Sequence, residues 1–117
     1  MEKVLVLMRT SPYGTVMNRE GFRVSIGLAA CEMAVEAILM DDGVYAALNE
    51  QKPRKIGIAS LEKAYRDIES KFDVPLYIHL ESLEKRGIGE NDVVPAKPID
   101  TAGIRKKISQ ADAVLTF

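Results

Sequence analysis

Short apolar runs that alternate with helix-period segments constrain the fold of this chain more than any other feature. The run KVLVLM at residues 3–8 is apolar throughout after its first residue, which is typical of a strand covered on both faces. Strand-like runs follow at residues 35–40, 74–80 and 113–117, and a short extended piece is expected within residues 90–100. We therefore predict a sheet whose strands are separated by helices.

The segments between these runs carry apolar residues at steps of three and four, the spacing of a helix with one buried face. In the first such segment Asn18 is the expected N-cap, and the predicted inward face follows it. Cys31 falls among small apolar residues of the same helix, so we interpret it as a packed and inert thiol. The predicted inward face consists of Phe22, Ile26, Ala29, Ala30 and Met33.

Further helices are predicted along the rest of the chain. A second long helix is expected at residues 61–72, capped by Ser60, and short helices are expected at residues 44–50 and 81–87. A last helix leads into the final strand-like run. Its expected cap is Asp100 or Thr101, and its expected inward residues are Ile104, Ile108 and Ala111.

Strands that alternate with helices imply right-handed crossovers and a mostly parallel sheet with helices on both faces. The length of 117 residues suits one domain that spans residues 1–117. The expected fold class is therefore α/β, a single-domain three-layer sandwich. In such sheets, binding sites form beyond the carboxyl ends of the strands.

Charge and cysteine content argue against several classes of protein. The chain has 16 basic and 17 acidic side chains, so its formal net charge of −1 gives no sign of nucleic-acid binding. Its single cysteine cannot form an internal disulfide, and no stretch approaches the ~20 apolar residues of a membrane span. We therefore expect a soluble cytoplasmic protein without membrane or direct nucleic-acid contacts. The basic residues interpreted as a solvated surface are Lys52, Arg54, Lys55, Lys85 and Arg86.

Three segments converge on the predicted carboxyl edge of the sheet. They are the loop from Thr10 to Met17, the turn after the second strand from Asp41 to Gly43, and the end of the third strand from His79 onward. Polar and small side chains in these segments form a candidate pocket. The candidate pocket residues are Ser11, Tyr13, Gly14, Asp41, Asp42 and Ser82.

The loop TSPYGT has two interpretations besides a plain connection. Small residues and a glycine ahead of a helix can present backbone N–H groups to an anion such as a flavin phosphate, although neither common nucleotide-binding glycine pattern is present. The apolar side chains of Tyr13, Val16 and Met17 instead indicate a subunit contact. Asp41 and Asp42 have no third acid placed nearby, so we interpret them as a solvated turn and expect neither a metal nor a cofactor.

His79 is the only histidine, and it lies where the third strand gives way to a helix. An imidazole titrates near neutral pH and can move protons or contact an anion. Glu81 or Glu84 is close enough in sequence to orient the ring, but the pattern supplies no nucleophile and no second metal ligand. Residue chemistry alone therefore favours a structural role, a histidine packed or hydrogen-bonded at an edge.

Four motifs, taken in order, resemble the DsrE/DsrF-like family and in particular its TusC/DsrF branch. They are RTSPYGTVMNREGFRVSIGLAA around the first loop and helix, MDDGVYAAL after the second strand, SLEKRGI after the third, and DAVLTF in the last strand. Each motif is short, but together they span essentially the whole chain at the family's spacing. The resemblance implies a small α/β fold with a five-stranded sheet.

The resemblance also implies a relay of persulfide sulfur, towards 2-thiouridine in transfer RNA or towards sulfur oxidation. It implies a trimer or hexamer with DsrE- and DsrH-like sister chains, and sulfur-carrier proteins as indirect partners. In the sulfur-carrying branch a cysteine accepts the sulfur at the position that corresponds to His79. An imidazole cannot form a persulfide, so the resemblance predicts a non-catalytic subunit. His79 would then line a vestigial or shared pocket, or bond to a partner's sulfur carrier.

Two other interpretations stay open from the sequence. The chain is either a small-ligand or flavin-phosphate binding module that uses the TSPYGT loop, or a stand-alone homo-oligomer of the same fold. The absence of tryptophan and the few aromatic residues leave little to sandwich a flavin ring. As the resemblance implies an accessory subunit of a sulfurtransferase system, the chain is not expected to be an enzyme by itself.

Overall fold

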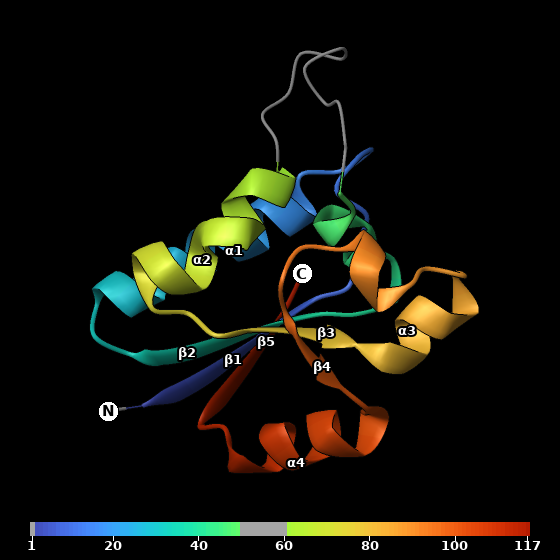
Figure 1. The fold of residues 1–117 in the computed structure, drawn as a ribbon. Helices are drawn as coiled ribbons and strands as arrows, with labels where there is room; N and C mark the ends of the chain where they lie inside the picture. Colours follow the sequence, from blue (N-terminus) through green and yellow to red (C-terminus); the bar gives the residue numbers. More distant parts are fainter. Residues whose placement is uncertain (1, 50–60) are drawn as a thin grey trace.

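The structure is a computed structural model that describes residues 2–49 and 61–117. Its strands and helices alternate along the chain, and the elements stack in layers (Figure 1). The predicted cap Ser60 and the basic residues Lys52, Arg54 and Lys55 lie outside the described residues. Within the described residues, no helix combines the length and apolar character that crossing a bilayer requires.

In the described part of the chain, five strands form one sheet, in which every pair of neighbours runs parallel. The order across the sheet is β4-β3-β2-β1-β5, so the chain steps outward from β1 to β4 and then crosses to the opposite edge for β5. The predicted parallel five-stranded sheet is therefore confirmed. The strands are β1 (Lys3–Met8), β2 (Ala34–Leu39), β3 (Leu76–His79), β4 (Lys97–Ile99) and β5 (Ala113–Thr116).

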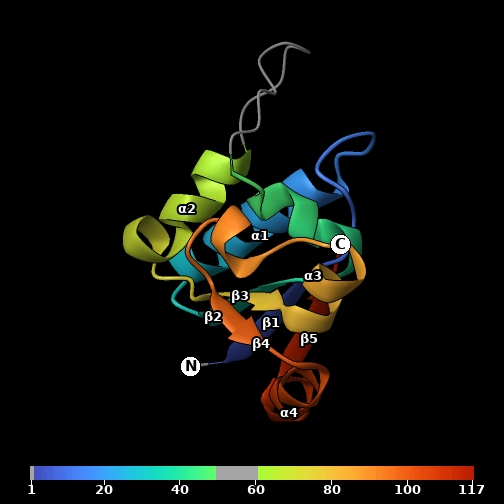
Figure 2. The same ribbon diagram turned by 45° about the vertical axis from the view of Figure 1, so that its right-hand side comes forward.

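Helices cover both faces of this sheet, as the alternating pattern predicts, but they cover them unequally (Figures 1 and 2). The helices α1 (Met17–Ala30) and α2 (Leu61–Phe72) lie on one face, whereas α4 (Thr101–Gln110) lies on the other. Shorter helical segments follow β2 and β3, and another lies between α3 and β4. They are η1 (Asp41–Ala47), α3 (Leu80–Lys85) and η3 (Glu90–Asp92).

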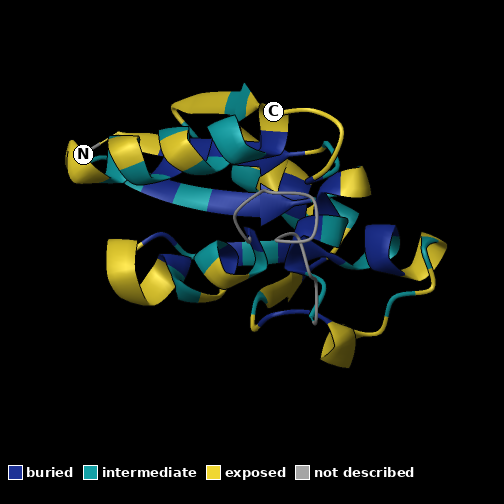
Figure 3. Ribbon diagram, turned by 90° about the horizontal axis from the view of Figure 1, so that it is seen from above, coloured by how far each residue is buried: buried dark blue, intermediate teal, exposed yellow. Residues whose placement is uncertain are grey.

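The alternation of side chains along β1 builds a core on each face of the sheet. Val6 and Met8 belong to the larger buried cluster, which includes Tyr65 of α2. Leu5 and Leu7 belong to a second cluster with Ile104 of α4. Figure 3 shows the result, because buried residues run through the strands and exposed residues occupy the outer surfaces of the helices.

Gly43 explains how closely η1 packs on the end of β1. A Cβ atom at this position would collide with the backbone carbonyl of Met8, so no side chain fits there. The Met40 N–H donates to the same Met8 oxygen at 3.0 Å. The chain therefore passes directly over the end of β1 and brings Asp41 to the carboxyl edge of the sheet.

Four predictions about single residues are wrong, and one of them concerns Ala30, which was expected on the inward face of α1 but is exposed near the end of that helix. Asn18 does not cap α1, because the helix begins one residue earlier and Asn18 is fully buried within its first turn. Cys31 is exposed rather than packed, because α1 ends before it and Glu32 takes a left-handed φ of 65°. Ile108 is 41% exposed rather than inward-facing, since Ile104 is the residue that α4 buries.

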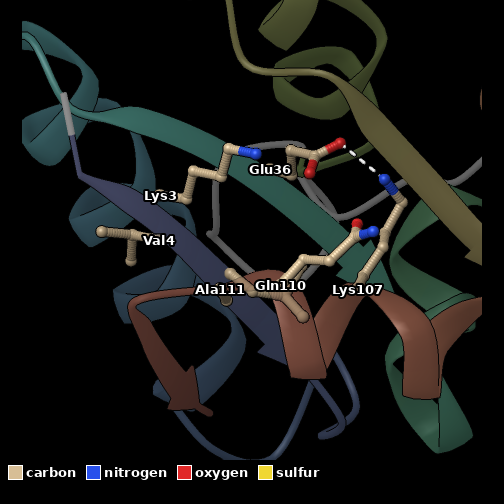
Figure 4. A pocket seen from close by; sticks show the side chains of 7 residues that line it. Lys3, Val4, Glu36, Lys107, Gln110 and Ala111 are labelled. Carbon is tan, nitrogen blue, oxygen red and sulfur yellow. Dashed lines mark hydrogen bonds and ion pairs between the residues drawn. The ribbon is translucent and has the colours of Figure 1, made fainter.

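The face under α4 also carries a polar cluster (Figure 4). Lys107 Nζ lies 2.8 Å from Glu36 Oε2 and 4.3 Å from the centroid of the Tyr77 ring. Burial alone would raise the pKa of Glu36, but hydrogen bonds from Lys107 and Tyr77 outweigh it and hold that pKa below its ordinary value. The adjoining cavity of about 30 Å³ has room for about one water molecule. The cluster itself joins α4 to the sheet, because Lys107 belongs to α4 and Glu36 belongs to β2.

Candidate functional site

His79 is the last residue of β3 and the N-cap residue of α3, so it stands where strand becomes helix. Only 8% of the residue is exposed, and its φ of −76° and ψ of 117° are ordinary extended values. Across the sheet it pairs with Ile99 at the end of β4. A buried ring with two polar nitrogens needs a partner for each of them.

The Nδ1 atom of His79 lies 2.6 Å from Ser82 Oγ. The same hydroxyl oxygen accepts a hydrogen bond from the Asp41 N–H at 2.8 Å. The Ser82 hydroxyl therefore joins the ring of His79 to the backbone of the turn after β2.

The Nε2 atom of His79 lies 2.8 Å from Thr101 Oγ1 and 3.5 Å from Glu81 Oε1. The Thr101 hydroxyl accepts from Nε2–H and donates to the Glu81 carboxylate, and the Thr101 N–H donates to Glu81 Oε2 at 2.9 Å. These bonds, the hydroxyl's first, hold the pKa of Glu81 below its ordinary value. These bonds connect a set that we call the His79 network: Asp41, Ser82, His79, Thr101 and Glu81.

The His79 network limits the chemistry of this position. Both ring nitrogens are bonded within the chain, so neither is left to bond to a partner. Ser82, His79 and Glu81 are the residue types of a serine–histidine–acid triad, but the Thr101 hydroxyl stands between the ring and the acid. Ser82 is also only 3% exposed, and its oxygen already accepts a backbone N–H. A buried hydroxyl in this setting is not an accessible nucleophile, and the network is a structural arrangement.

Two arginines brace the turn after β2. Arg9 Nε donates to Asp41 Oδ2 at 2.7 Å, and Arg86 Nε and Nη2 donate to Asp42 Oδ1 at 3.1 and 2.9 Å. Arg86 Nη1 also donates to the Ser82 carbonyl oxygen at 3.1 Å. Asp41 has a left-handed φ of 50°, which aspartate tolerates better than most residues. Each carboxylate therefore has its own arginine, so the turn that we interpreted from the sequence as solvated is held by ion pairs.

A buried tyrosine anchors the loop between β1 and α1. The Tyr65 hydroxyl donates to Asn18 Oδ1 at 2.6 Å, and Asn18 Nδ2 donates to the Thr10 carbonyl oxygen at 2.8 Å. Burial raises the pKa of Tyr65, so its hydroxyl stays protonated and remains the donor. Asn18 is therefore buried because it links α2 to the loop, a tertiary role that outweighs its preference for a cap.

Hydroxyls of the loop accept bonds from the loop's own backbone. Ser11 Oγ accepts from the Tyr13 N–H and Thr15 Oγ1 accepts from the Met17 N–H, both at 3.3 Å. Gly14 has a φ of 90°, a conformation that favours glycine. Some of the N–H groups that a phosphate would need are thus already bonded inside the loop.

The predicted pocket residues separate into two groups. Asp41, Asp42 and Ser82 come together next to His79, through the Asp41 N–H and through Arg86. The other three predicted residues belong to the loop, where Ser11 bonds to Tyr13 and Gly14 shapes the backbone. The predicted convergence at the carboxyl edge therefore holds best for the segments after β2 and β3.

Thr101 is the site residue that sequence reasoning missed as a partner of the ring. It was expected only as a possible helix start, and Asp100 is the actual cap, accepting from the Gly103 N–H at 2.7 Å. Glu81 does orient His79, but it acts mainly through Thr101. The register of β3 and β4 is the feature that reveals this partner, because His79 pairs with Ile99 and Thr101 follows Ile99 by two residues.

The single thiol lies at the other end of the sheet. Cys31 is exposed, follows the last residue of α1, and comes shortly before β2 begins. His79 instead ends β3, a strand that runs parallel to β2. Cys31 is therefore at the amino end of the strands and His79 is at the carboxyl end.

Comparison with known proteins decides the family. A sequence model described as the DsrE/DsrF-like family matches residues 2–117. This chain belongs to the DsrE/DsrF-like family. It is 28% identical over 132 residues to the intracellular sulfur oxidation protein DsrF of Allochromatium vinosum, an alignment that covers 100% of this chain and 97% of that protein. A TusC homolog of Vibrio parahaemolyticus is 30% identical over 122 residues and is covered completely, as is this chain. Both relatives match the TusC/DsrF branch of the family.

Solved structures confirm the DsrE/DsrF-like fold. The ychN protein of E. coli superposes with a TM-score of 0.85 at 27% identity, and all of both chains is covered. The protein MTH1491 of Methanobacterium thermoautotrophicum superposes with a TM-score of 0.73 at 11% identity, again over both whole chains. At this identity the second likeness concerns the fold alone, so it shows the same architecture in a protein with a very different sequence.

Proposed function

We propose that this chain is a subunit of a sulfur-relay complex and that it supports the transfer of persulfide sulfur without accepting the sulfur itself. The relatives support the relay role, since one is named for intracellular sulfur oxidation and another is a TusC homolog. The observation that carries the proposal is the state of His79. Its ring is buried and both of its nitrogens are bonded within the chain.

The chemistry of sulfur transfer supports the second half of the proposal. An acceptor thiolate attacks the outer sulfur of a donor persulfide, takes that sulfur, and releases the donor as a thiolate. His79 has no sulfur with which to begin this exchange. Cys31 has one, but it lies at the opposite end of the strands and outside the His79 network. The chain thus acts as an accessory subunit.

In the proposed complex, DsrE- and DsrH-like sister chains carry the reactive cysteine, in a trimer or hexamer. The contact surface on this chain includes the exposed side chains of Tyr13, Val16 and Met17, with exposed fractions of 37%, 64% and 42%. Apolar side chains exposed at that level are typical of a surface that another chain covers. The relay ends in sulfur oxidation or in 2-thiouridine synthesis.

Coexpression with sister chains tests this proposal. A tag on this chain is expected to retain DsrE- and DsrH-like chains, and cysteine desulfurase with radioactive cysteine is expected to label a sister chain. Val16→Glu should release the sister chains, whereas Phe72→Glu, at a side chain that is 41% exposed near the amino end of the sheet, should retain them. A preparation that retains no sister chain, or that carries the label on this chain, contradicts the proposal.

A further inference from the structure

The loop between β1 and α1 carries the proposed contact surface, and one side chain holds its two ends together. Asn18, in the first turn of α1, is fully buried, and its Nδ2 atom donates to the Thr10 carbonyl oxygen at 2.8 Å. Thr10 begins the loop, and Asn18 follows the last loop residue, eight positions further along the chain. This bond therefore closes the base of a loop that projects beyond the start of α1 (Figure 2).

The Tyr65 hydroxyl of α2 fixes the orientation of the Asn18 amide. It donates to Asn18 Oδ1 at 2.6 Å, and Tyr65 is only 1% exposed. An amide whose oxygen accepts this bond directs its NH₂ group the other way, towards Thr10. The Tyr65 ring is itself held against Phe22 of α1, edge to face, with ring centroids 5.3 Å apart. A buried hydroxyl of α2 thus determines how the base of the loop is closed.

The exposed apolar residues of the loop are attached directly to this anchor. Val16 and Met17, which are 64% and 42% exposed, immediately precede Asn18 in the chain. Tyr13, which is 37% exposed, lies between the two anchored ends. The two bonds that hydroxyls of the loop accept from its own backbone are both 3.3 Å long, beyond the usual range for a strong N–H···O bond. The shorter bonds at the base therefore hold the loop more firmly than its internal bonds do.

We propose that Tyr65 is a positioning residue for the binding of sister chains, because its hydroxyl, acting through Asn18, holds the loop in the arrangement that the partner contacts. At 1% exposure Tyr65 does not meet the partner itself, so it acts only through the loop. A loop that is already held in its bound arrangement loses less conformational freedom on binding, and the affinity rises. This inference rests on the proposed function, since it takes the sister chains as the partner.

Affinity measurements test the positioning role. The DsrE- and DsrH-like chains that co-purify with the tagged wild-type chain are isolated and titrated against each variant by biolayer interferometry. Tyr65→Phe keeps the ring and its contact with Phe22 but removes the hydroxyl, so it should weaken binding about threefold. Asn18→Ala removes both bonds at the base and should weaken binding about tenfold, and Tyr65→Phe alone decides the result if Asn18→Ala does not fold.

Ser25→Ala is the matched control for a general loss of stability. Ser25 is fully buried about two turns further along α1, and its hydroxyl donates to the Gly21 carbonyl oxygen at 2.8 Å. The substitution removes a buried hydrogen bond from the same helix without changing the base of the loop, so binding should stay at the wild-type level. Binding is measured well below the unfolding midpoint of every variant. Equal weakening by Ser25→Ala and Tyr65→Phe overturns the proposal.

Limited proteolysis tests the state of the loop without a partner. Chymotrypsin cleaves after tyrosine, and Tyr13 lies within the loop. Cleavage of the folded chain at this bond requires the loop to open locally, so the cleavage rate follows the population of the open form. Tyr65→Phe should speed cleavage after Tyr13 about fivefold, and Ser25→Ala should not, with the fragments identified by mass spectrometry. An unchanged rate in Tyr65→Phe overturns the proposal.

The outcomes separate this inference from the function on which it rests. If Val16→Glu releases the sister chains but Tyr65→Phe binds them as the wild type does, the positioning role is wrong and the sulfur-relay role stands. A wild-type chain that retains no sister chain overturns both. Weaker binding and faster cleavage in Tyr65→Phe, with neither change in Ser25→Ala, support the positioning role.

Discussion

The two ends of the sheet hold their most reactive side chains in opposite ways. At the carboxyl end His79 is 8% exposed, and its ring is bonded to Ser82 and Thr101. At the amino end Cys31 is exposed, and it directly follows a helix. His79 therefore has defined hydrogen-bond partners but no sulfur atom, whereas the Cys31 thiol is exposed at the other end of the sheet. This separation is why family membership and a thiol do not together indicate a sulfur acceptor.

The comparison also shows what the His79 network does in place of chemistry. A polar network around a buried ring whose two nitrogens are both bonded fixes one arrangement of its elements, and it is costly to break. The network connects the turn after β2, the junction of β3 and α3, and the start of α4. We infer that His79 stabilises the carboxyl edge of the sheet. Substitutions there should therefore lower the free energy of unfolding more than a substitution of Cys31 at the amino end.

The largest effect is expected when the ring itself is removed. His79→Ala should lower the free energy of unfolding by about 3 kcal/mol, because it leaves a cavity and deprives the buried Ser82 hydroxyl and the partly buried Thr101 hydroxyl of their partner. Denaturant unfolding monitored by circular dichroism measures it. A loss below about 1 kcal/mol would show that the network adds little to stability and would weaken the contrast between the ends.

A smaller loss is expected when only one bond of the network is removed. Thr101→Val keeps the shape of the side chain but removes the hydroxyl that links His79 to Glu81, so the free energy of unfolding should fall by about 1–2 kcal/mol. The exposed Thr116 offers a matched control, and Thr116→Val should change stability by less than about 0.5 kcal/mol. Equal effects of the two substitutions would contradict the importance of the network.

The network should also contribute to the acid dependence of stability. Hydrogen bonds from Thr101 lower the pKa of Glu81 from an ordinary value of 4.5, so the folded state binds this proton less readily than the unfolded state. That stabilisation is present above the ordinary pKa and is lost as the pH falls through the lowered one. Glu81→Gln should therefore flatten the thermal stability profile below about pH 5, and an unchanged profile would contradict the assignment.

The smallest effect is expected at the amino end of the sheet. Cys31→Ser should change the free energy of unfolding by less than about 0.5 kcal/mol, since the side chain is exposed. The native thiol should react with Ellman's reagent at a rate close to that of the unfolded chain. A protected thiol, or a large loss of stability in Cys31→Ser, would mean that the two ends are more alike than the structure indicates.

Much of the fold is predictable because its signals are local. The apolar run at residues 3–8 and the helical spacing after Asn18 each reflect one element's own burial pattern. One kind of error occurs where a residue's role depends on a distant partner. Asn18 is polar and near a helix start, as a cap would be, but Tyr65 draws it inside. Another kind concerns the end of a helix. The exposure of Cys31 depends on where α1 ends, and the small apolar residues around Cys31 do not indicate that end.

The candidate site was predictable in its position but not in its bonding. A parallel sheet brings the ends of its strands to one edge, so the sequence places His79 near Asp41 and Ser82 without any coordinates. The partnership with Thr101 depends instead on the pairing of β3 with β4, a strand of three residues with a weak sequence pattern. Short edge strands are held by tertiary contacts, and a sequence pattern contains little information about those contacts.

Intact-mass analysis of the assembled complex during turnover tests the central claim most directly. The wild-type chain and Cys31→Ser are each assembled with the sister chains and supplied with cysteine desulfurase and cysteine. We predict that the sister chain gains the mass of one sulfur atom, that this chain gains none, and that both complexes transfer sulfur at the same rate. A one-sulfur adduct that appears on this chain, passes onward, and is lost in Cys31→Ser would contradict the account.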